Sequence, residues 1–185
     1  MSAAVVLDPA FGYVIVLGCA LLFAHAALGK WRHIAEFRQV LANYRLVPAA
    51  LVAMLGILVP AAESAVALLV LAAATRALAA AAGAVLLLGY AAAIAVNLRR
   101  GRYDLDCGCA GPADRRPIAG WMVWRNAVLA LALAAATLPW SARPLGWTDA
   151  ATVGGGLAVL VLVYAALDRL LGQVMPRTAV LRGVR

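Results

Sequence analysis

The sequence predicts an all-α fold, a polytopic transmembrane helical bundle with a four-helix core and a fifth transmembrane helix at the C-terminus. Apolar residues make up 66% of the 185 residues, and charged residues make up only 13%. Soluble domains average about 45–50% apolar and about 25% charged residues. The mean hydropathy is +0.94, and the apolar residues form runs that reach the roughly 20 helical residues needed to cross a hydrocarbon core.

Five apolar runs predict five membrane-spanning helices, at residues 9–31, 48–74, 75–97, 118–138 and 150–171. The first run lacks the basic segment of a cleavable signal peptide and follows Asp8, so we expect it to remain as a helix. The apolar stretch over 46–96 would measure roughly 75 Å as one helix, which is too long for a bilayer. It must therefore fold back, and the charge of Arg76 marks the turn. Pro139 closes the fourth span.

A short amphipathic helix is predicted between the first two spans. Over residues 33–44, apolar side chains recur at spacings of three and four, with Glu36 and Arg38 on the other face. This pattern is typical of a helix that lies on the membrane surface. No polar stretch is long enough to form a second domain, so we expect residues 1–185 to form a single integral membrane domain.

The distribution of Lys and Arg predicts the orientation in the membrane. With the N-terminus outside, all but two of the 16 basic residues fall on the cytoplasmic side, and the two exceptions are Arg76 and Arg143. This bias follows the positive-inside rule and places both the loop after the third span and the C-terminus in the cytoplasm. The lipid bilayer is therefore the predicted partner. A nucleic acid is not, because the sequence has no basic-aromatic groove or known nucleic-acid-binding motif.

The cytoplasmic loop carries Cys107 and Cys109, with one glycine between them. Two cysteines at this spacing can reach the Cα separation of about 4.4–6.8 Å that a disulfide requires, and Gly108 permits the bend. Nearby arginines favour a reactive thiolate, while Asp104 and Asp106 oppose it. We interpret the pair as a thiol–disulfide couple. The alternatives are an inert thiol pair and half of a metal site, but zinc normally takes four ligands, so no metal is predicted.

Three residues inside the predicted spans are weaker site candidates. Glu63, expected at roughly the depth of Cys19, is a costly intramembrane carboxylate of the kind that is often functional; it could carry a proton or hydrogen-bond a quinone or a backbone group. Cys19 is either a packed apolar side chain or a relay for thiol exchange. His25, which we expect to be buried, is either a satisfied core histidine or a proton relay.

A set of residues spread over most of the chain resembles a known family. The set is Phe23, Lys30, Phe37, Tyr44, Pro48, Pro60, Glu63, Asn97-Leu98, Gly101-Arg102, Asp106-Cys107-Gly108-Cys109, Gly111 and Arg125-Asn126. It is similar to the methylamine utilisation protein MauE family, within the broader MauE/DoxX group of redox-associated membrane proteins, over about residues 10–135. The Asp-Cys-Gly-Cys element after an Asn-Leu helix end is the most specific part. Ala110 departs from the pattern, since many relatives have an aromatic residue there.

The resemblance implies a multi-pass protein of the bacterial inner membrane that assists maturation of the methylamine dehydrogenase light (β) subunit beside a thioredoxin-like partner. Thiol–disulfide oxidoreductase is the candidate activity and a quinone the candidate cofactor. The alternative is a non-enzymatic assembly factor or scaffold. That subunit matures outside the cytoplasm, whereas the basic residues place the cysteines inside. Either the protein passes electrons across the bilayer, or its partner is cytoplasmic, or the orientation is inverted.

Overall fold

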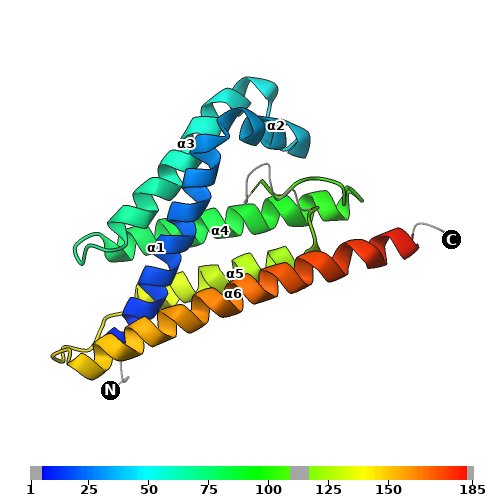
Figure 1. Cartoon of the computed structure of the whole chain (residues 1–185). Coiled ribbons are helices and arrows are strands. Elements are labelled where there is room, and N and C mark those ends of the chain that lie inside the picture. Colours follow the sequence, from blue (N-terminus) through cyan, green and yellow to red (C-terminus); the bar gives the residue numbers. More distant parts are fainter. Residues whose placement is uncertain (1–5, 109–116, 183–185) are drawn as a thin grey trace, which may run out of the picture.

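The computed structural model describes residues 6–108 and 117–182. Over these residues the regular structure is entirely helical, which confirms the predicted fold class. The helices are α1 (Pro9–Arg32), α2 (Ile34–Tyr44), α3 (Ala49–Leu69), α4 (Arg76–Arg99), α5 (Gly120–Ala136) and α6 (Trp147–Arg182). Figure 1 shows α1 and α3 crossing the group formed by α4, α5 and α6.

Four helical segments in the described part of the chain are long and apolar enough to cross a membrane, namely α1, α3, α4 and residues 147–171 of α6. The predicted turn at Arg76 is confirmed, because α4 begins there. The fourth predicted span, over 118–138, is shorter than expected: α5 has 17 residues, or about 26 Å of helical rise. The backbone N–H of Ile118 donates to the carbonyl of Leu105 at 2.8 Å, which keeps the chain extended before α5 begins.

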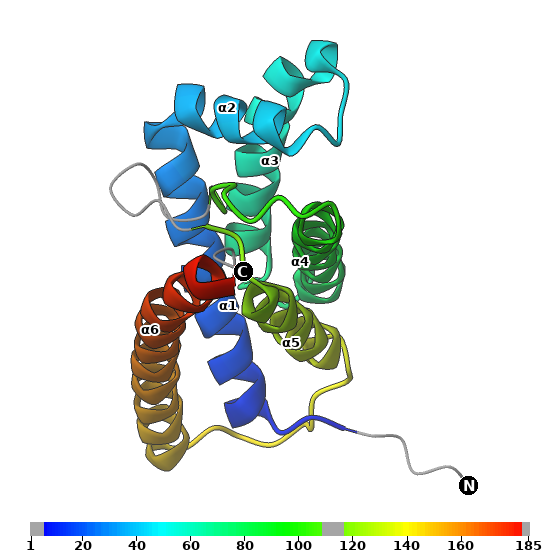
Figure 2. The same ribbon diagram turned by 90° about the vertical axis from the view of Figure 1, so that its right-hand side faces the viewer.

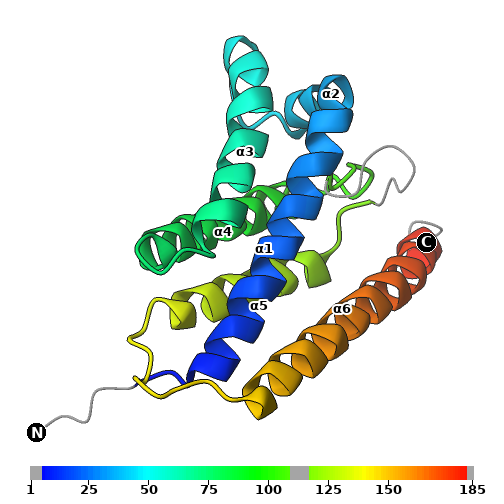
Figure 3. The same ribbon diagram turned by 60° about the vertical axis from the view of Figure 1, so that its left-hand side comes forward.

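α1 lies at the centre of the bundle. It contacts α3, α5 and α6, while α4 packs against α5 and α3. In Figures 2 and 3, α1 passes between α5 and α6, with α3 alongside it and α2 turned across its C-terminal end. The C-terminal helix is therefore attached to the bundle mainly through α1.

The core combines small side chains with a few large ones. Phe23, Val16 and Leu133 are almost fully buried, and alanines from several helices surround them. Gly83 on α4 marks a close approach between helices. A Cβ at that position would lie only 3.0–3.1 Å from the side chains of Leu133, Val66 and Phe23. Small residues permit this spacing in membrane proteins, where van der Waals packing holds helices together.

One end of the bundle is closed by contacts between segments far apart in the sequence. The backbone N–H of Leu7 donates to the carbonyl of Pro139 at 2.9 Å. The Arg143 guanidinium donates to the carboxylates of Asp8 and Asp149 at 2.7–3.0 Å. These bonds tie the N-terminus of α1 to that of α6. The hydrogen bonds from Arg143 also lower the pKa of the Asp8 carboxyl below its usual value.

Arg76 belongs to the same end of the bundle. Its guanidinium carbon lies 3.7 Å from the ring centroid of Trp140 and 5.6 Å from that of Tyr13, which is a cation–π arrangement. Arg76 and Arg143 are the two basic residues that the charge distribution places apart from the others. The structure brings them to one end, in agreement with that grouping.

α2 covers the opposite end of α1. The helix predicted over 33–44 is confirmed at Ile34–Tyr44, and it buries Phe37 and Tyr44. The chain changes direction at His33, between α1 and α2. α2 ends just before Arg45, which adopts the left-handed conformation with a φ of 49°. The helix packs on α3 and so forms a wall beside the loop that follows α4.

Candidate functional site

A buried ion pair links α1 to α3. The ammonium of Lys30 donates to both carboxylate oxygens of Glu63, at 2.7 and 2.9 Å. The Glu63 side chain is 0% exposed and that of Lys30 is 5% exposed. From α4, the Tyr90 hydroxyl donates to the same carboxylate at 2.7 Å. The two donors compensate a charge that would be costly inside a membrane on its own.

Aromatic rings surround the Lys30 ammonium. Its nitrogen lies 5.4 Å from the ring centroid of Phe37 and 5.6 Å from that of Tyr90, within the range of cation–π attraction. Each of the first four helices therefore contributes one side chain to this site. We refer to Lys30, Phe37, Glu63 and Tyr90 as the ion-pair cluster.

An apolar cavity of about 90 Å³ lies beside the ion-pair cluster. It is lined by Lys30, Phe37, Val40, Leu41, Tyr44, Val59, Tyr90, Ala93, Ile94 and Cys107. Cys107 is half-buried and packs against the hydrophobic cluster that includes Ile94 and Leu105. Cys107 is thus turned toward the bundle and shares a cavity with the Lys30 side chain.

The backbone around Cys107 is fixed on both sides. Leu105 accepts the hydrogen bond from Ile118, and Asp106 forms an antiparallel bridge with the next segment. The Asp106 carboxylate accepts a hydrogen bond from the N–H of Gly108 at 3.1 Å. Gly108 has a φ of +70°, a conformation that glycine adopts without steric cost. A Cβ there would also lie 3.0 Å from a methyl carbon of Val40, so glycine allows the turn to rest against α2.

Arg102 fastens the start of this loop to α2. Its guanidinium donates to the carbonyl oxygens of Asn43 and Tyr44, at 2.6 and 3.4 Å. It also donates to the side-chain oxygen of Asn97 at 3.1 Å. Asn97 is fully buried and donates in turn to the carbonyl of Ala93 at 3.1 Å. The loop, α2 and the end of α4 are therefore held as one unit.

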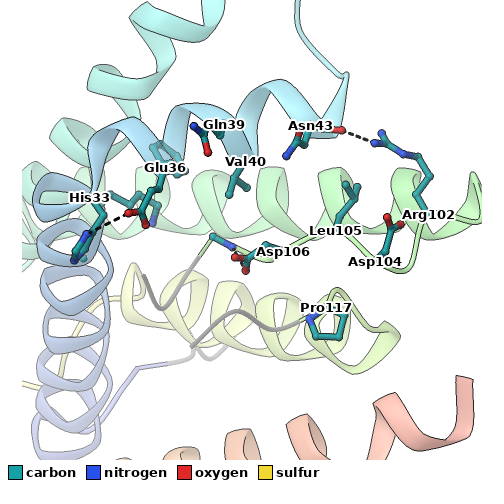
Figure 4. A pocket seen from close by; sticks show the side chains of 14 residues that line it. His33, Glu36, Gln39, Val40, Asn43, Arg102, Asp104, Leu105, Asp106 and Pro117 are labelled. Carbon is teal, nitrogen blue, oxygen red and sulfur yellow. Dashed lines mark hydrogen bonds and ion pairs between the residues drawn. The ribbon is translucent and has the colours of Figure 1, made fainter. Parts of the chain in front are cut away.

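A polar cavity of about 490 Å³ lies between α2 and the 102–108 segment. Its polar lining consists of Lys30, His33, Glu36, Gln39, Asn43, Arg102, Asp104 and Asp106. In Figure 4, Val40 on α2 points toward the segment that carries Asp106. Lys30, Phe37 and Val40 line both the polar and the apolar cavity. They form the wall between the two.

A second ion pair joins α5 to α6. Arg125 donates to the carboxylate of Asp168 at 3.0 Å, and its guanidinium carbon lies 5.1 Å from the ring centroid of Trp121 and 5.8 Å from that of Tyr164. None of these residues is among those described as lining the two cavities. This pair therefore attaches α6 away from Cys107.

The structure brings together two of the predicted site residues, Cys107 and Glu63, through Lys30. Glu63 does not lie at the depth of Cys19 as expected. It lies level with Lys30, because residues 33–48 carry the chain beyond the end of α1 before α3 begins. Cys19 is buried in the hydrophobic core with Val16 and Phe23, a different cluster from the one that Cys107 contacts. Cys109 lies outside the described residues.

The expectation that His25 is buried is wrong. Its side chain is exposed, whereas Phe23, Ala27 and Lys30 on the same helix are buried. Residues at spacings of three and four share one face of a helix, and this face of α1 meets the bundle. His25 lies on another face. The sequence pattern did not distinguish the faces because α1 is apolar on all sides.

Lys30 and Tyr90 were not predicted as site residues from the sequence, nor was Asp168 predicted as the partner of Arg125. A signal for the Lys30–Glu63 ion pair was present. Lys30 lies inside the apolar run of α1 and Glu63 lies in the next run along the chain, and opposite charges in neighbouring spans tend to pair. Tyr90 carried no such signal, since a tyrosine in an apolar helix is more often a packed aromatic side chain.

Comparison with known proteins identifies the family to which this site belongs. Residues 8–140 match the family model described as methylamine utilisation protein MauE. The chain belongs to this family. The MauE match extends from the start of α1 past the end of α5. It therefore includes every residue of the ion-pair cluster as well as Cys107.

Curated relatives with the name methylamine utilization protein MauE cover most of the chain. The relative from Paracoccus versutus is 41% identical over 179 residues, which are 95% of this chain and 96% of the relative. The relative from Paracoccus denitrificans is 39% identical over 164 residues, 87% and 88% of the two chains. The relative from Methylophilus methylotrophus is 36% identical over 167 residues, 89% and 88% of the two chains. No solved structure gives a significant match.

Proposed function

We propose that this protein acts in methylamine utilisation as a membrane thiol–disulfide redox protein. A disulfide between Cys107 and Cys109 oxidises the dithiol of a thioredoxin-like partner. The partner supports disulfide formation in a client such as the light subunit of methylamine dehydrogenase. Two electrons and two protons pass from the partner to the cysteine pair. A membrane quinone is the class of acceptor that would take them and restore the disulfide.

The placement of Cys107 is the observation that carries this proposal. Its backbone is fixed by the Leu105–Ile118 hydrogen bond and the Asp106 turn, and it shares a cavity with Lys30. Thiol–disulfide exchange proceeds through a thiolate, and a neighbouring cation favours that form. A cysteine with a fixed backbone that shares a cavity with a buried ammonium is thus suited to the reaction. The names of the relatives supply the link to methylamine utilisation.

Trapping of mixed disulfides tests the proposal. Cys107→Ser and Cys109→Ser each leave one thiol of the pair. At least one of the two variants, mixed under a mild thiol oxidant with a thioredoxin-like protein that keeps only its nucleophilic cysteine, should form a disulfide-linked adduct, visible on non-reducing gels. Cys19→Ala is the matched control. It removes a cysteine that is buried in the core and keeps both cysteines of the pair, so the second cysteine should resolve the mixed disulfide and no stable adduct should accumulate. Absence of an adduct from both serine variants, under oxidising and reducing conditions alike, would refute the proposal.

A variant that lacks both cysteines distinguishes a redox role of the protein from a scaffold role. The double variant Cys107→Ser/Cys109→Ser should fail to support growth of a methylotrophic host on methylamine, if the pair must cycle. Membrane abundance of the variant serves as the control. Normal growth with the double variant at normal abundance would favour a non-enzymatic assembly factor instead.

We also propose that the chain is a single multi-pass domain of the bacterial inner membrane, with the N-terminus outside and the Cys-Gly-Cys loop in the cytoplasm. The charge distribution supports this orientation. The position of Arg76 and Arg143 at one end of the bundle agrees with it. In this orientation either the partner is cytoplasmic or electrons cross the bilayer.

A further inference from the structure

Cys107 faces the apolar cavity rather than the polar one. Cys107 lines the apolar cavity, whereas Gly108, the next residue, lines the polar one. Cys107 also packs against buried apolar side chains. It is therefore turned away from the polar cavity, which is the side from which a water-soluble partner would approach.

Lys30 is the cation among the described residues that line the apolar cavity. Apolar surroundings disfavour a thiolate, but they also screen a nearby positive charge less than water does. Glu63 accepts two hydrogen bonds from Lys30 and so offsets part of its field. Tyr44 and Tyr90 complete the titratable groups of this cavity, and tyrosines are uncharged at neutral pH.

The charged groups of the polar cavity act on Cys107 in both directions. Asp104, Asp106 and Glu36 disfavour a thiolate, and the first two lie on the same segment as the cysteine. Arg102 and His33 have the opposite effect when they are protonated. Arg102 is bound to the end of α2, and Glu36 lies 3.8 Å from His33. Lys30 is thus the cation that shares the apolar cavity with Cys107, and its side chain is only 5% exposed.

We propose that Cys107 is the leaving sulfur of the cysteine pair and that Lys30 stabilises its thiolate. This inference rests on the proposed function and adds the direction of attack. A partner thiolate attacks the sulfur of Cys109, the Cys107–Cys109 bond breaks, and the bonding electron pair passes to the sulfur of Cys107. The second partner thiolate then attacks the partner's own sulfur in the mixed disulfide and releases Cys109. The partner leaves as a disulfide, and its two protons end on the reduced pair.

The role of Lys30 follows from the leaving group. A thiol of lower pKa leaves faster in disulfide exchange, so a cation beside Cys107 accelerates the step in which that sulfur departs. Lys30 acts on the reaction only by stabilising the thiolate of Cys107, so it is a positioning residue in this scheme. Glu63 and Tyr90 hold its ammonium in place.

The pH profile of Cys107 alkylation tests the role of Lys30. In full-length Cys19→Ala/Cys109→Ser protein, Cys107 is the single thiol, and its rate of reaction with iodoacetamide reports the thiolate fraction. Lys30→Met should raise the midpoint of the profile by about one pH unit and slow alkylation about tenfold at neutral pH. Lys30→Arg should keep the midpoint near that of the parent. A loss of packing alone would change the rate without moving the midpoint.

The control for this profile is Arg99→Met, which removes an exposed charge at the end of α4 and should leave the midpoint unchanged. If Lys30→Met does not fold, Lys30→Gln replaces it, because an amide can still donate to Glu63. An unchanged midpoint in the folded Lys30 variant would overturn the role of Lys30.

The amount of mixed disulfide formed by each of the two serine variants tests the direction of attack. Under the same mild thiol oxidant, Cys107→Ser keeps the sulfur that bonds to the partner in this scheme, so it should accumulate several-fold more mixed disulfide than Cys109→Ser. The reverse ratio would overturn the assignment of Cys107 as leaving sulfur and leave the proposed function standing. A failure of both variants to form an adduct would instead refute the proposed function. The alkylation profile, which needs no partner, then still decides the role of Lys30.

Discussion

Lys30 and Glu63 place opposite charges in the interior of a protein whose surroundings are mostly hydrocarbon. Each charge is tolerated because the other is 2.7 Å away and Tyr90 supplies a further hydrogen bond. A pair of this kind costs desolvation energy when it forms. Because Lys30 lines both cavities, we explain the pair by a function at Cys107 rather than by stability alone.

Breaking the pair should destabilise the protein strongly. Glu63→Gln leaves the Lys30 ammonium buried without a counter-ion, and losses of this kind cost about 3–5 kcal/mol. Thermal unfolding in detergent should show a large drop in Tm. Tyr90→Phe removes one hydrogen bond and should cost about 1 kcal/mol. The double variant Lys30→Met/Glu63→Leu should recover part of the loss, since it buries no charge. Equal Tm values for Glu63→Gln and the parent would contradict this account.

At the scale of helices, α4 approaches its neighbours closely at Gly83 and leaves Gly89 open. A Cβ at Gly83 would press on the side chains of Leu133, Val66 and Phe23, whereas nothing lies within 4 Å of a Cβ at Gly89. The two glycines lie on the same helix, so they differ in packing rather than in backbone preference. They form a matched pair for a test of the core.

Gly83→Leu should therefore destabilise the bundle, and Gly89→Leu should not. Overpacking a close contact costs about 1–3 kcal/mol or more, because the helices must separate to admit the side chain. The measurement is the Tm of each variant in the same detergent. A similar Tm for both would mean that the contacts around Gly83 can relax.

The helices could be predicted from the sequence, and so could Cys107 and Glu63 as candidate residues, but the ion-pair cluster that connects them could not. Apolar run length and the charge of Arg76 predicted the fold-back at the start of α4, and the pattern over 33–44 predicted α2. The ion-pair cluster depends on where α3 begins relative to α1, which is set by the path of residues 33–48. No periodicity within a single run contains that information. The later start of α5, at Gly120 rather than Ile118, likewise comes with a tertiary contact, the hydrogen bond between Ile118 and Leu105.

At the scale of the whole molecule, Arg143 ties α1 to α6 through Asp8 and Asp149. The pKa of Asp8 is lowered in the folded protein because Arg143 donates hydrogen bonds to its carboxylate. A lowered pKa means that the stabilisation is present above the unfolded value, near 3.8, and is lost as the pH falls through the lower folded value. The pKa of Arg143 is raised by the same contacts, so it stays protonated throughout.

Asp8→Asn should therefore lower the Tm at neutral pH, and the difference from the parent should shrink as the pH falls below about 4. Tm measured over that pH range in detergent checks the expectation. Both side chains are partly exposed, so the effect should be small and should weaken with added salt. A difference that grows toward acid pH would have the wrong sign for this interaction.

Labelling from each side of the membrane tests the orientation. In protein without native cysteines, Tyr103→Cys places an exposed thiol near the Cys-Gly-Cys loop, and Ala142→Cys places one at the Arg143 end. An impermeant maleimide should label position 103 from the cytoplasmic side and position 142 from the opposite side. The reverse pattern would show that the orientation is inverted and would put the cysteine pair on the outer side.

The attachment of α6 has a consequence for how its sequence can change over evolution. None of its most apolar window is buried, while its first turn is bound to Arg143 and its later part to Arg125. Gly156 and Leu160 lie close to Val14 and Gly18 of α1, so selection acts mainly through compatibility with lipid only on the other side of the stretch between those anchors. Descendants of this chain should therefore keep Asp149 and Asp168 while exchanging Val, Leu and Ala freely along the lipid-facing side of the intervening turns.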